Sequence, residues 1–185
     1  MELRLATKDD MPQVVNLIKI ILDDMELPIL LNNPESEVMD LFVKTFQSDT
    51  YAKLADTIVA VQDGEVAGVA FGYDGSNEEP LLAEFGNHFD AKLPKQPVFT
   101  EPEAVEKEWY LNSIAVNPKF QRQGIGSKLL NEIPHYASQR GLTKIGLLVD
   151  LANPDAERLY RRSGFKDFKT QMVSGHEYKH LQKEI

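Results

Sequence analysis

The chain contains no cysteine. This absence excludes disulfide bonds, thiolate metal ligands and a covalent intermediate carried on a cysteine. The sequence also lacks any run of eighteen consecutive apolar residues, the length that a membrane-spanning helix needs. Its first ten residues, MELRLATKDD, carry charges where a signal peptide has an apolar stretch. We therefore expect a soluble, cytoplasmic protein that does not interact with a membrane.

Basic residues are fewer than acidic ones. Lys and Arg number 20 and Asp and Glu number 29, which gives a formal net charge of −9 at pH 7. Duplex nucleic acids are bound by clustered Lys and Arg side chains, so this balance argues against a nucleic acid partner. Nine acidic residues and three lysines lie between Asp74 and Glu108, so this segment carries six of the nine net negative charges. The segment is either a solvated loop or an acidic rim that concentrates a cationic amine.

Length and hydrophobic content indicate a single domain over residues 1–185, because 185 residues of which 42% are hydrophobic can bury one good core. Periodicity predicts a strand over residues 2–6, a helix after Thr7 and a second helix from about Pro34. Two β-rich runs, TIVAVQ and EVAGVAFGY, flank the dipeptide Asp63-Gly64, which is a strong hairpin signal.

The rest of the chain divides into an insertion and a second structured part. Residues 74–108 contain four prolines and predict an irregular, acidic insertion with some helical character near Leu81 to His88. From Trp109 the pattern is strand, glycine loop, helix, strand, helix and two strands that are joined near Ser174-Gly175. An antiparallel hairpin followed later by a crossover helix requires a mixed sheet. The predicted fold class is therefore α+β, with a central mixed sheet flanked by helices.

A glycine loop, QRQGIG over residues 121–126, stands between a strand-like run and a helix-like run. Small residues let a backbone approach an anion, and the first N–H groups of a helix are unpaired and attract negative charge. The arrangement predicts a phosphate-binding loop with Arg122 as an added cation, and the alternative is an ordinary glycine turn. A P-loop is excluded because Leu147 and Leu148 follow the only comparable glycine spacing. A dinucleotide fold is disfavoured because Leu129 replaces its third glycine.

Two sequence signatures resemble those of the GNAT superfamily, the acetyl-CoA-dependent N-acetyltransferases. The first, Q/R-x-x-G-x-G/A, is matched by Gln121, Gly124 and Gly126. The second, N-x-x-A-x-x-L-Y-x-x-x-G-F, is matched by the run from Asn153 to Phe165. The strong resemblance covers about residues 109–166, and it implies the acyl-CoA N-acyltransferase fold and acetyl-CoA as cosubstrate.

The resemblance also implies which residues hold acetyl-CoA. Backbone N–H groups of the glycine loop would bind its pyrophosphate, and backbone groups of Ile114 and Val116 would pair with its pantetheine arm like an added strand. The second contact requires the strand that contains Ile114 and Val116 to splay from its neighbour. The implied cofactor-binding residues are Ile114, Ala115, Val116, Gln121, Arg122, Gln123, Gly124, Ile125, Gly126, Ser127, Asn153 and Tyr160.

Tyr160 and Glu108 are the predicted catalytic residues. In the resembling family the tyrosine lies near the sulfur and can protonate the leaving thiolate, which suits a phenol with a pKa near 10. The alternative for Tyr160 is a core aromatic residue. Glu108, beside the predicted core strand, is a candidate to accept the proton of the amine, and its alternative is one more acid of the rim. The N–H of Val116 would hold the oxyanion, and the absence of cysteine favours direct transfer.

Four further residues are candidates for a role in the site. His176 and His180 would share one face of a strand, but no third ligand stands at a telling distance, so no metal site is predicted. Trp109 and Tyr110 either flank the acceptor site or pack in the core.

The predicted function is transfer of an acetyl group from acetyl-CoA to a primary amine in a ternary complex. The acceptor is a small amine or a peptide amine, and the acidic surface favours a polyamine, an aminoglycoside-like molecule or a basic peptide end. The alternative function is a non-catalytic acyl-CoA-binding module that regulates a partner. Dimers are common among the proteins that the chain resembles, which makes a homodimer an expectation by analogy.

Overall fold

A computed structural model describes residues 1–25, 28–93, 101–173 and 175–185. Ser174, in the predicted last turn, lies outside the described residues. The strands are β1 (Glu2–Leu5), β2 (Ala55–Gln62), β3 (Glu65–Asp74), β4 (Trp109–Val116), β5 (Lys144–Asp150), β6 (Lys166–Val173) and β7 (His176–Glu184). The helices are α1 (Met11–Asp24), α2 (Pro28–Asn32), α3 (Glu35–Phe46), α4 (Asp49–Leu54), α5 (Glu78–Asp90), α6 (Ile125–Gln139) and α7 (Pro154–Arg162).

The strands form one seven-stranded sheet in the order β1-β2-β3-β4-β5-β7-β6. Neighbouring strands are antiparallel except for β4 and β5, which are parallel. A parallel pair needs a crossover connection, and α6 provides it between β4 and β5. The predicted mixed sheet with flanking helices is confirmed.

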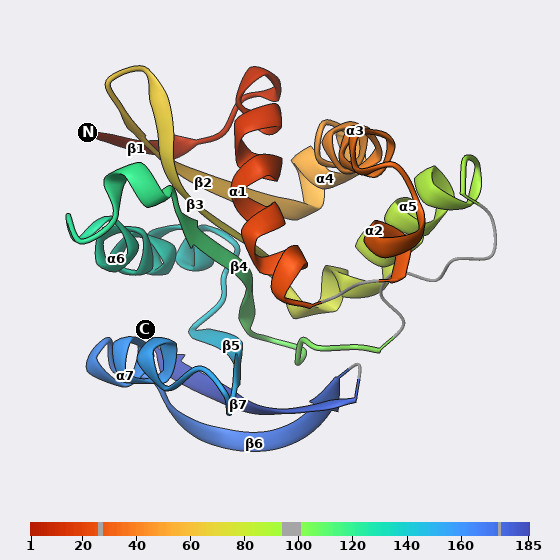
Figure 1. Cartoon of the computed structure of the whole chain (residues 1–185). Helices are drawn as coiled ribbons and strands as arrows, with labels where there is room; N and C mark the ends of the chain where they lie inside the picture. The colour runs from red at the N-terminus through yellow and green to blue at the C-terminus, as the bar shows by residue number, and fades with distance from the viewer. Residues whose placement is uncertain (26–27, 94–100, 174) are drawn as a thin grey trace.

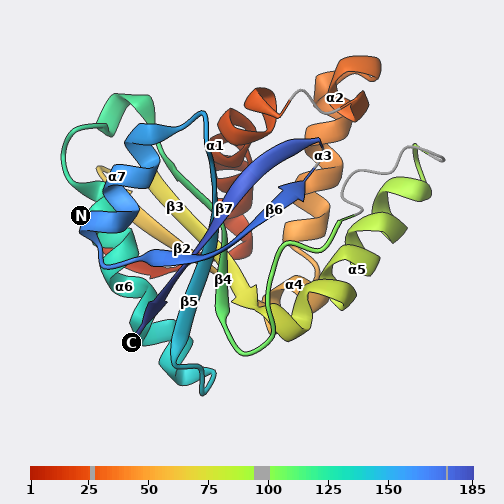
Figure 2. The ribbon, with the colours of Figure 1, turned by 90° about the horizontal axis from the view of Figure 1, so that it is seen from below.

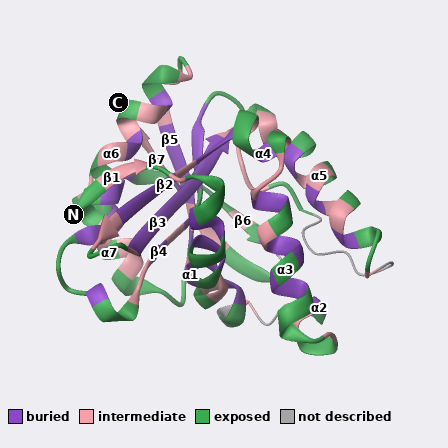
Figure 3. Cartoon of the chain, turned by 90° about the horizontal axis from the view of Figure 1, so that it is seen from above, coloured by how far each residue is buried: buried purple, intermediate pink, exposed green. Residues whose placement is uncertain are grey.

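Helices cover both faces of the sheet (Figure 1, Figure 2). On one face, α1 packs over β3 and β4, and α3 packs against both α1 and α5. Phe42, Phe85 and Phe71 belong to the buried cluster on this face. On the other face, Leu129 and Ile133 of α6 belong to a second cluster. Figure 3 shows the buried residues gathered in the central strands and on one side of α3. The sheet therefore separates two apolar layers.

The hairpin and the first helix start as the sequence predicts. Asp63 and Gly64 have φ values of 53° and 81°, the positive values that a two-residue hairpin turn requires. The short turn over residues 8–10 leads into α1, and the Asp10 carboxylate accepts a hydrogen bond of 2.7 Å from the Thr7 amide. Both features confirm the local signals in the sequence.

The segment 74–108 is more ordered than the predicted irregular insertion. Thirteen of its residues form α5, which extends beyond the helical stretch expected near Leu81 to His88. Leu81, Phe85 and Phe89 recur at a spacing of four and are buried, so tertiary packing stabilises this helix. Pro80 does not break it because it lies in the first turn, where a missing N–H costs no hydrogen bond. Residues 94–100 of the segment lie outside the described residues.

Within the described ranges, the longest helix is too short and too polar to cross a lipid bilayer.

Candidate active site

Strands β4 and β5 run side by side for only part of their length. Three residue pairs join them, Trp109 with Ile145, Tyr110 with Gly146 and Leu111 with Leu147. Beyond Leu111 the next residues of β4 have no partner on β5 in the described chain. The splay that pantetheine binding requires is thus present.

The backbone of β4 presents free groups to this gap. The Asn117 amide donates to Ala67 O of β3 at 3.0 Å. Backbone groups in a strand alternate in direction, so those of Ala115 also face β3, whereas those of Ile114 and Val116 face the gap. The backbone groups of Ile114 and Val116, which the resemblance in the sequence assigns to pantetheine, therefore face a gap in which an extended ligand can form hydrogen bonds with them.

The glycine loop lies at the start of α6. Gly124 has a φ of 77° and precedes the first helical residue, and a Cβ atom built on Gly124 meets nothing within 4 Å. The first amide of the helix with a backbone acceptor is that of Lys128, which donates to Gly124 O at 3.0 Å. Among the described residues, the amides from Arg122 to Ser127 have no such acceptor. Unpaired amides around open space fit a phosphate group.

Tyr160 and Asn153 lie on α7 in different surroundings. Tyr160 is 9% exposed and belongs to the same buried cluster as Leu147 and Val149 of β5. Burial raises the pKa of Tyr160 to about 12, so its hydroxyl stays protonated at neutral pH and can donate a proton. Asn153 is exposed, and its side-chain oxygen accepts a 3.1 Å bond from the Ala156 amide. Asn153 therefore caps the helix that carries Tyr160.

The role predicted for Glu108 does not fit its position. The carboxylate is 1% exposed and accepts hydrogen bonds from Gln182 Nε2 at 2.7 Å, from the Val105 amide at 3.0 Å and from His180 Nε2 at 3.1 Å. Its oxygens are occupied and no path to an acceptor amine is open. Glu108 instead ties β4 to β7 across β5.

The backbone beneath Glu108 must be glycine. A Cβ atom on Gly146 would lie 2.1 Å from Glu108 Oε2. We expect Gly146→Ala to lower the free energy of unfolding by more than about 2 kcal/mol, because it displaces a buried, hydrogen-bonded carboxylate. Gly86→Ala is the control, since a Cβ there meets nothing within 4 Å and should stabilise α5 by about 0.5–1 kcal/mol. Urea unfolding of both variants measures the difference, and equal stability of Gly146→Ala and wild type would contradict it.

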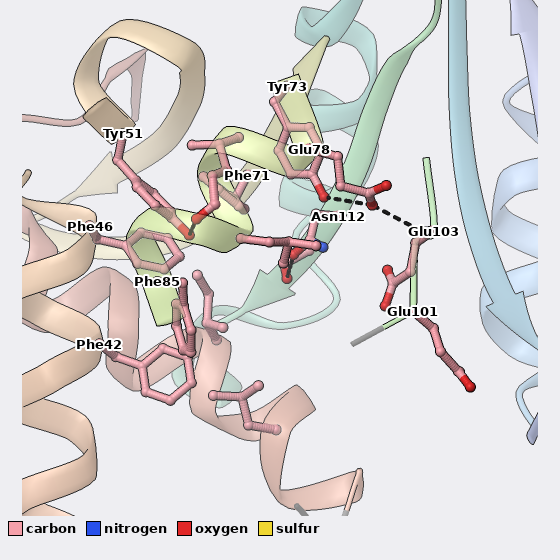
Figure 4. A pocket seen from close by; sticks show the side chains of 15 residues that line it. Phe42, Phe46, Tyr51, Phe71, Tyr73, Glu78, Phe85, Glu101, Glu103 and Asn112 are labelled. Carbon is pink, nitrogen blue, oxygen red and sulfur yellow. Dashed lines mark hydrogen bonds between the residues drawn. The ribbon is translucent and has the colours of Figure 1, made fainter. Parts of the chain in front are cut away.

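A pocket opens beside β4 on the face covered by α1, α3 and α5. Its atom-free space is about 580 Å³, part of it open to solvent. One end is aromatic and the other carries carboxylates (Figure 4). The described lining residues are Ile18, Leu22, Phe42, Phe46, Tyr51, Phe71, Tyr73, Glu78, Leu81, Leu82, Phe85, Glu101, Glu103, Asn112 and Ser113.

Two of the pocket carboxylates belong to a hydrogen-bonded network. Glu78 Oε1 accepts from the Glu103 amide at 2.9 Å and lies 3.4 Å from Tyr73 Oη (Figure 4). Glu103 Oε2 accepts a 2.7 Å bond from Tyr110 Oη. Burial raises the pKa of Glu103, the bond from Tyr110 counteracts this, and the charges of Glu78 and Glu101 add to the rise. Burial likewise raises the pKa of Tyr73 and of Tyr110.

The acetyltransferase (GNAT) family matches residues 27–165 of the chain, about three quarters of its length. The chain belongs to this acetyltransferase family. The match includes the glycine loop, the splayed strand and Tyr160.

Two solved acetyltransferase structures resemble this chain over almost its whole length. One acetyltransferase crystal structure is 38% identical, has a TM-score of 0.87 and covers 100% of both chains. An N-acetyltransferase from Staphylococcus aureus Mu50 is 26% identical with a TM-score of 0.86, and the alignment covers 98% of this chain and 100% of that one.

Curated relatives match over shorter stretches. The chain is 36% identical over 73 residues to the ribosomal protein bS18-alanine N-acetyltransferase of Escherichia coli, which is 40% of this chain and 49% of that enzyme. The chain thus spans about half the length of this relative, and 21–35% of the length of three others.

Other residues singled out in the sequence have structural positions in the fold. Trp109 is fully buried, and its Nε1 donates to Asp56 Oδ2 at 2.9 Å. His180 is also fully buried against Tyr110, whereas His176 is exposed. No group of three metal-ligating side chains occurs within the described part of the chain.

The sequence did not point to the pocket. Its lining comes from α1, α3, α4, β3, α5, the stretch after residue 100 and β4, so no local pattern brings these residues together. The available signal was the acidic run from Asp74 to Glu108, of which Glu78, Glu101 and Glu103 line the pocket.

Proposed function

We propose that this protein transfers an acetyl group from acetyl-CoA to the nitrogen of a primary amine, directly and in a ternary complex. The observation that supports it most strongly is the gap between β4 and β5, whose free backbone edge leads to the unpaired amides of the glycine loop. Membership of the acetyltransferase family agrees with this proposal.

The residues around the gap fit the cosubstrate. The amides from Arg122 to Ser127 would hold its pyrophosphate, and the backbone groups of Ile114 and Val116 would pair with its pantetheine arm. When bound, acetyl-CoA supplies an activated acyl carbon and a thiolate leaving group. The side chains and amides of this chain would orient the two substrates and transfer the protons.

Three groups move protons or hold charge in the proposed reaction. The Val116 amide donates to the oxygen of the carbonyl under attack. Tyr160 Oη donates a proton to the departing sulfur and then takes up the second proton that the nitrogen loses as the amide forms. The ammonium form of the amine must first lose a proton, because only the neutral nitrogen has a lone pair. Since Glu108 is enclosed, we assign the role of accepting this proton from the ammonium group to Glu103. Glu103 lines the pocket, and burial raises its pKa.

The acceptor is an amine of a small molecule or of a peptide. The Escherichia coli relative is named for acetylating an alanine of a ribosomal protein. The cytoplasmic location and the homodimer stay predictions.

Calorimetric titration with acetyl-CoA, CoA and NAD in parallel tests the proposed cosubstrate. We expect acetyl-CoA and CoA to bind and NAD not to bind, because the loop holds a pyrophosphate but lacks the third glycine of a dinucleotide fold. Binding of NAD alone, or of none of the three, would contradict the assignment. Acetyl transfer across a panel of amines then separates an enzyme from a non-catalytic acyl-CoA-binding module, which would bind without turnover.

A further inference from the structure

The aromatic end of the pocket is a wall of packed rings. The rings of Phe42 and Phe85 are 5.0 Å apart between centroids, and those of Phe46 and Phe71 are 4.8 Å apart. Tyr51 stacks on Phe71 with an interplanar angle of 8°. These rings come from α3, α5, α4 and β3, and each one restricts the rotamers of the next. Such a wall favours an apolar group of about the size of one ring.

The opposite end of the pocket carries the carboxylates of Glu78 and Glu103. Glu78 is 7% exposed, and neither Glu78 nor Glu103 forms an ion pair within the described residues. No Lys, Arg or His lies in the described part of the lining. Hydrogen bonds from the Glu103 amide and from Tyr110 Oη offset part of the cost of burying these carboxylates, and a ligand that brings a positive charge offsets more of it.

The charged end also adjoins the gap. Asn112 and Ser113 line the pocket, and they directly precede Ile114, whose backbone faces β5. The pairing of β3 and β4 shifts here, because Phe71 opposes Ser113 while Gly72 opposes Leu111, which leaves Asn112 as a bulge. A bulge re-aims the strand and its side chains, and it brings the carboxylate end of the pocket next to the edge where the acyl group is proposed to lie.

We propose that the pocket binds an arylalkylamine, with the ammonium between Glu78 and Glu103 and the ring against Phe42, Phe46 and Phe85. The identification of this ligand as the acetyl acceptor rests on the proposed function. A polyamine or an aminoglycoside fits less well, because its further charges or hydroxyls would lie against phenylalanine rings without hydrogen-bond partners. A single charge at one end and an apolar body at the other match the two ends of the pocket.

Titration with three probes without acetyl-CoA tests the inference. We expect 2-phenylethylamine to bind about tenfold or more tightly than its neutral analogue 2-phenylethanol, since only the ammonium forms charge-assisted hydrogen bonds with the carboxylates. Spermidine should bind at least about tenfold more weakly than 2-phenylethylamine, because two of its charges find no polar partner. Absence of 2-phenylethylamine binding, or tighter binding of spermidine, overturns the inference.

Single charge-removing variants locate the binding site. Glu103→Gln and Glu78→Gln should each weaken 2-phenylethylamine binding by about tenfold. Glu79→Gln is the matched control, because Glu79 follows Glu78 in the same turn of α5 but is exposed. It should change the affinity less than about twofold. An equal loss of affinity for 2-phenylethylamine in Glu79→Gln would mean that the net charge of the surface causes the effect, and it would overturn the proposed binding site.

The two proposals fail in different ways. If 2-phenylethylamine binds and responds to Glu103→Gln but is never acetylated, the pocket stands and its identification as the acceptor site is overturned. If acetyl-CoA binds and spermidine is acetylated while 2-phenylethylamine does not bind, the transferase stands and the pocket assignment is overturned.

Discussion

Gly124→Asp is expected to abolish binding of acetyl-CoA and CoA while the protein remains folded. A Cβ at position 124 meets no atom within 4 Å, so the new side chain enters the open space of the glycine loop. Its carboxylate would lie near a bound pyrophosphate. Two like charges about 4 Å apart at a protein surface repel by roughly 4 kcal/mol, which corresponds to a loss of about a thousandfold in affinity. Calorimetric titration with CoA measures this loss of affinity.

Two variants separate this charge effect from backbone strain. Gly124→Asn has nearly the same shape without the charge and should lose much less affinity than Gly124→Asp. Gly141 has a φ of 74° and equally open surroundings, but it follows the other end of α6. Gly141→Asp should therefore show a similar loss of stability, about 1 kcal/mol, with unchanged CoA affinity. Normal CoA affinity in a folded Gly124→Asp protein would place the pyrophosphate elsewhere.

Tyr160→Phe is expected to lower kcat by about 10²–10⁴-fold, the usual contribution of a general acid. The ring packs in a buried cluster with Leu147 and Val149, and the substitution keeps the ring, so CoA affinity and the unfolding midpoint should change little. Single-turnover transfer from acetyl-CoA to a good acceptor, measured next to CoA titration, gives both quantities.

A second substitution makes the result specific to the hydroxyl. Phe165 contacts Tyr160 with ring centroids 6.0 Å apart and is equally buried. Phe165→Leu perturbs the same cluster without removing a proton donor, so it should reduce stability more than kcat. Full activity of Tyr160→Phe would mean that water or another group protonates the thiolate.

The sequence predicted those elements whose structure depends on neighbouring residues. The Asp63-Gly64 turn, the strand before the glycine loop and the helix after it were predicted, because each depends on residues close together in the chain. The splay of β4 from β5 followed from the resemblance and is visible in the register.

Long-range contacts decided what the sequence could not predict. Glu108 was a reasonable base candidate as one acid among nine, but its burial depends on Gln182 and His180, more than seventy residues away. The helical character of residues 78–90 depends on phenylalanines of α3, since Phe42 packs against Phe85 and Phe89. The pocket joins seven segments of the chain, so its composition could be found only after folding.

The pairing of β4 with β5 is the shortest between neighbouring strands of this sheet. Three residue pairs join β4 to β5, and the bonds of Glu108 and the ring contact of Tyr110 with His180 add to them, whereas a molecule in the gap would contact both strands. Such a ligand would therefore stabilise the folded protein. At a hundred times its Kd it would add about 2.7 kcal/mol to the free energy of unfolding. The backbone amides of β5 should then exchange their hydrogens with solvent more slowly. The stability of the protein would therefore rise with the concentration of acetyl-CoA around it.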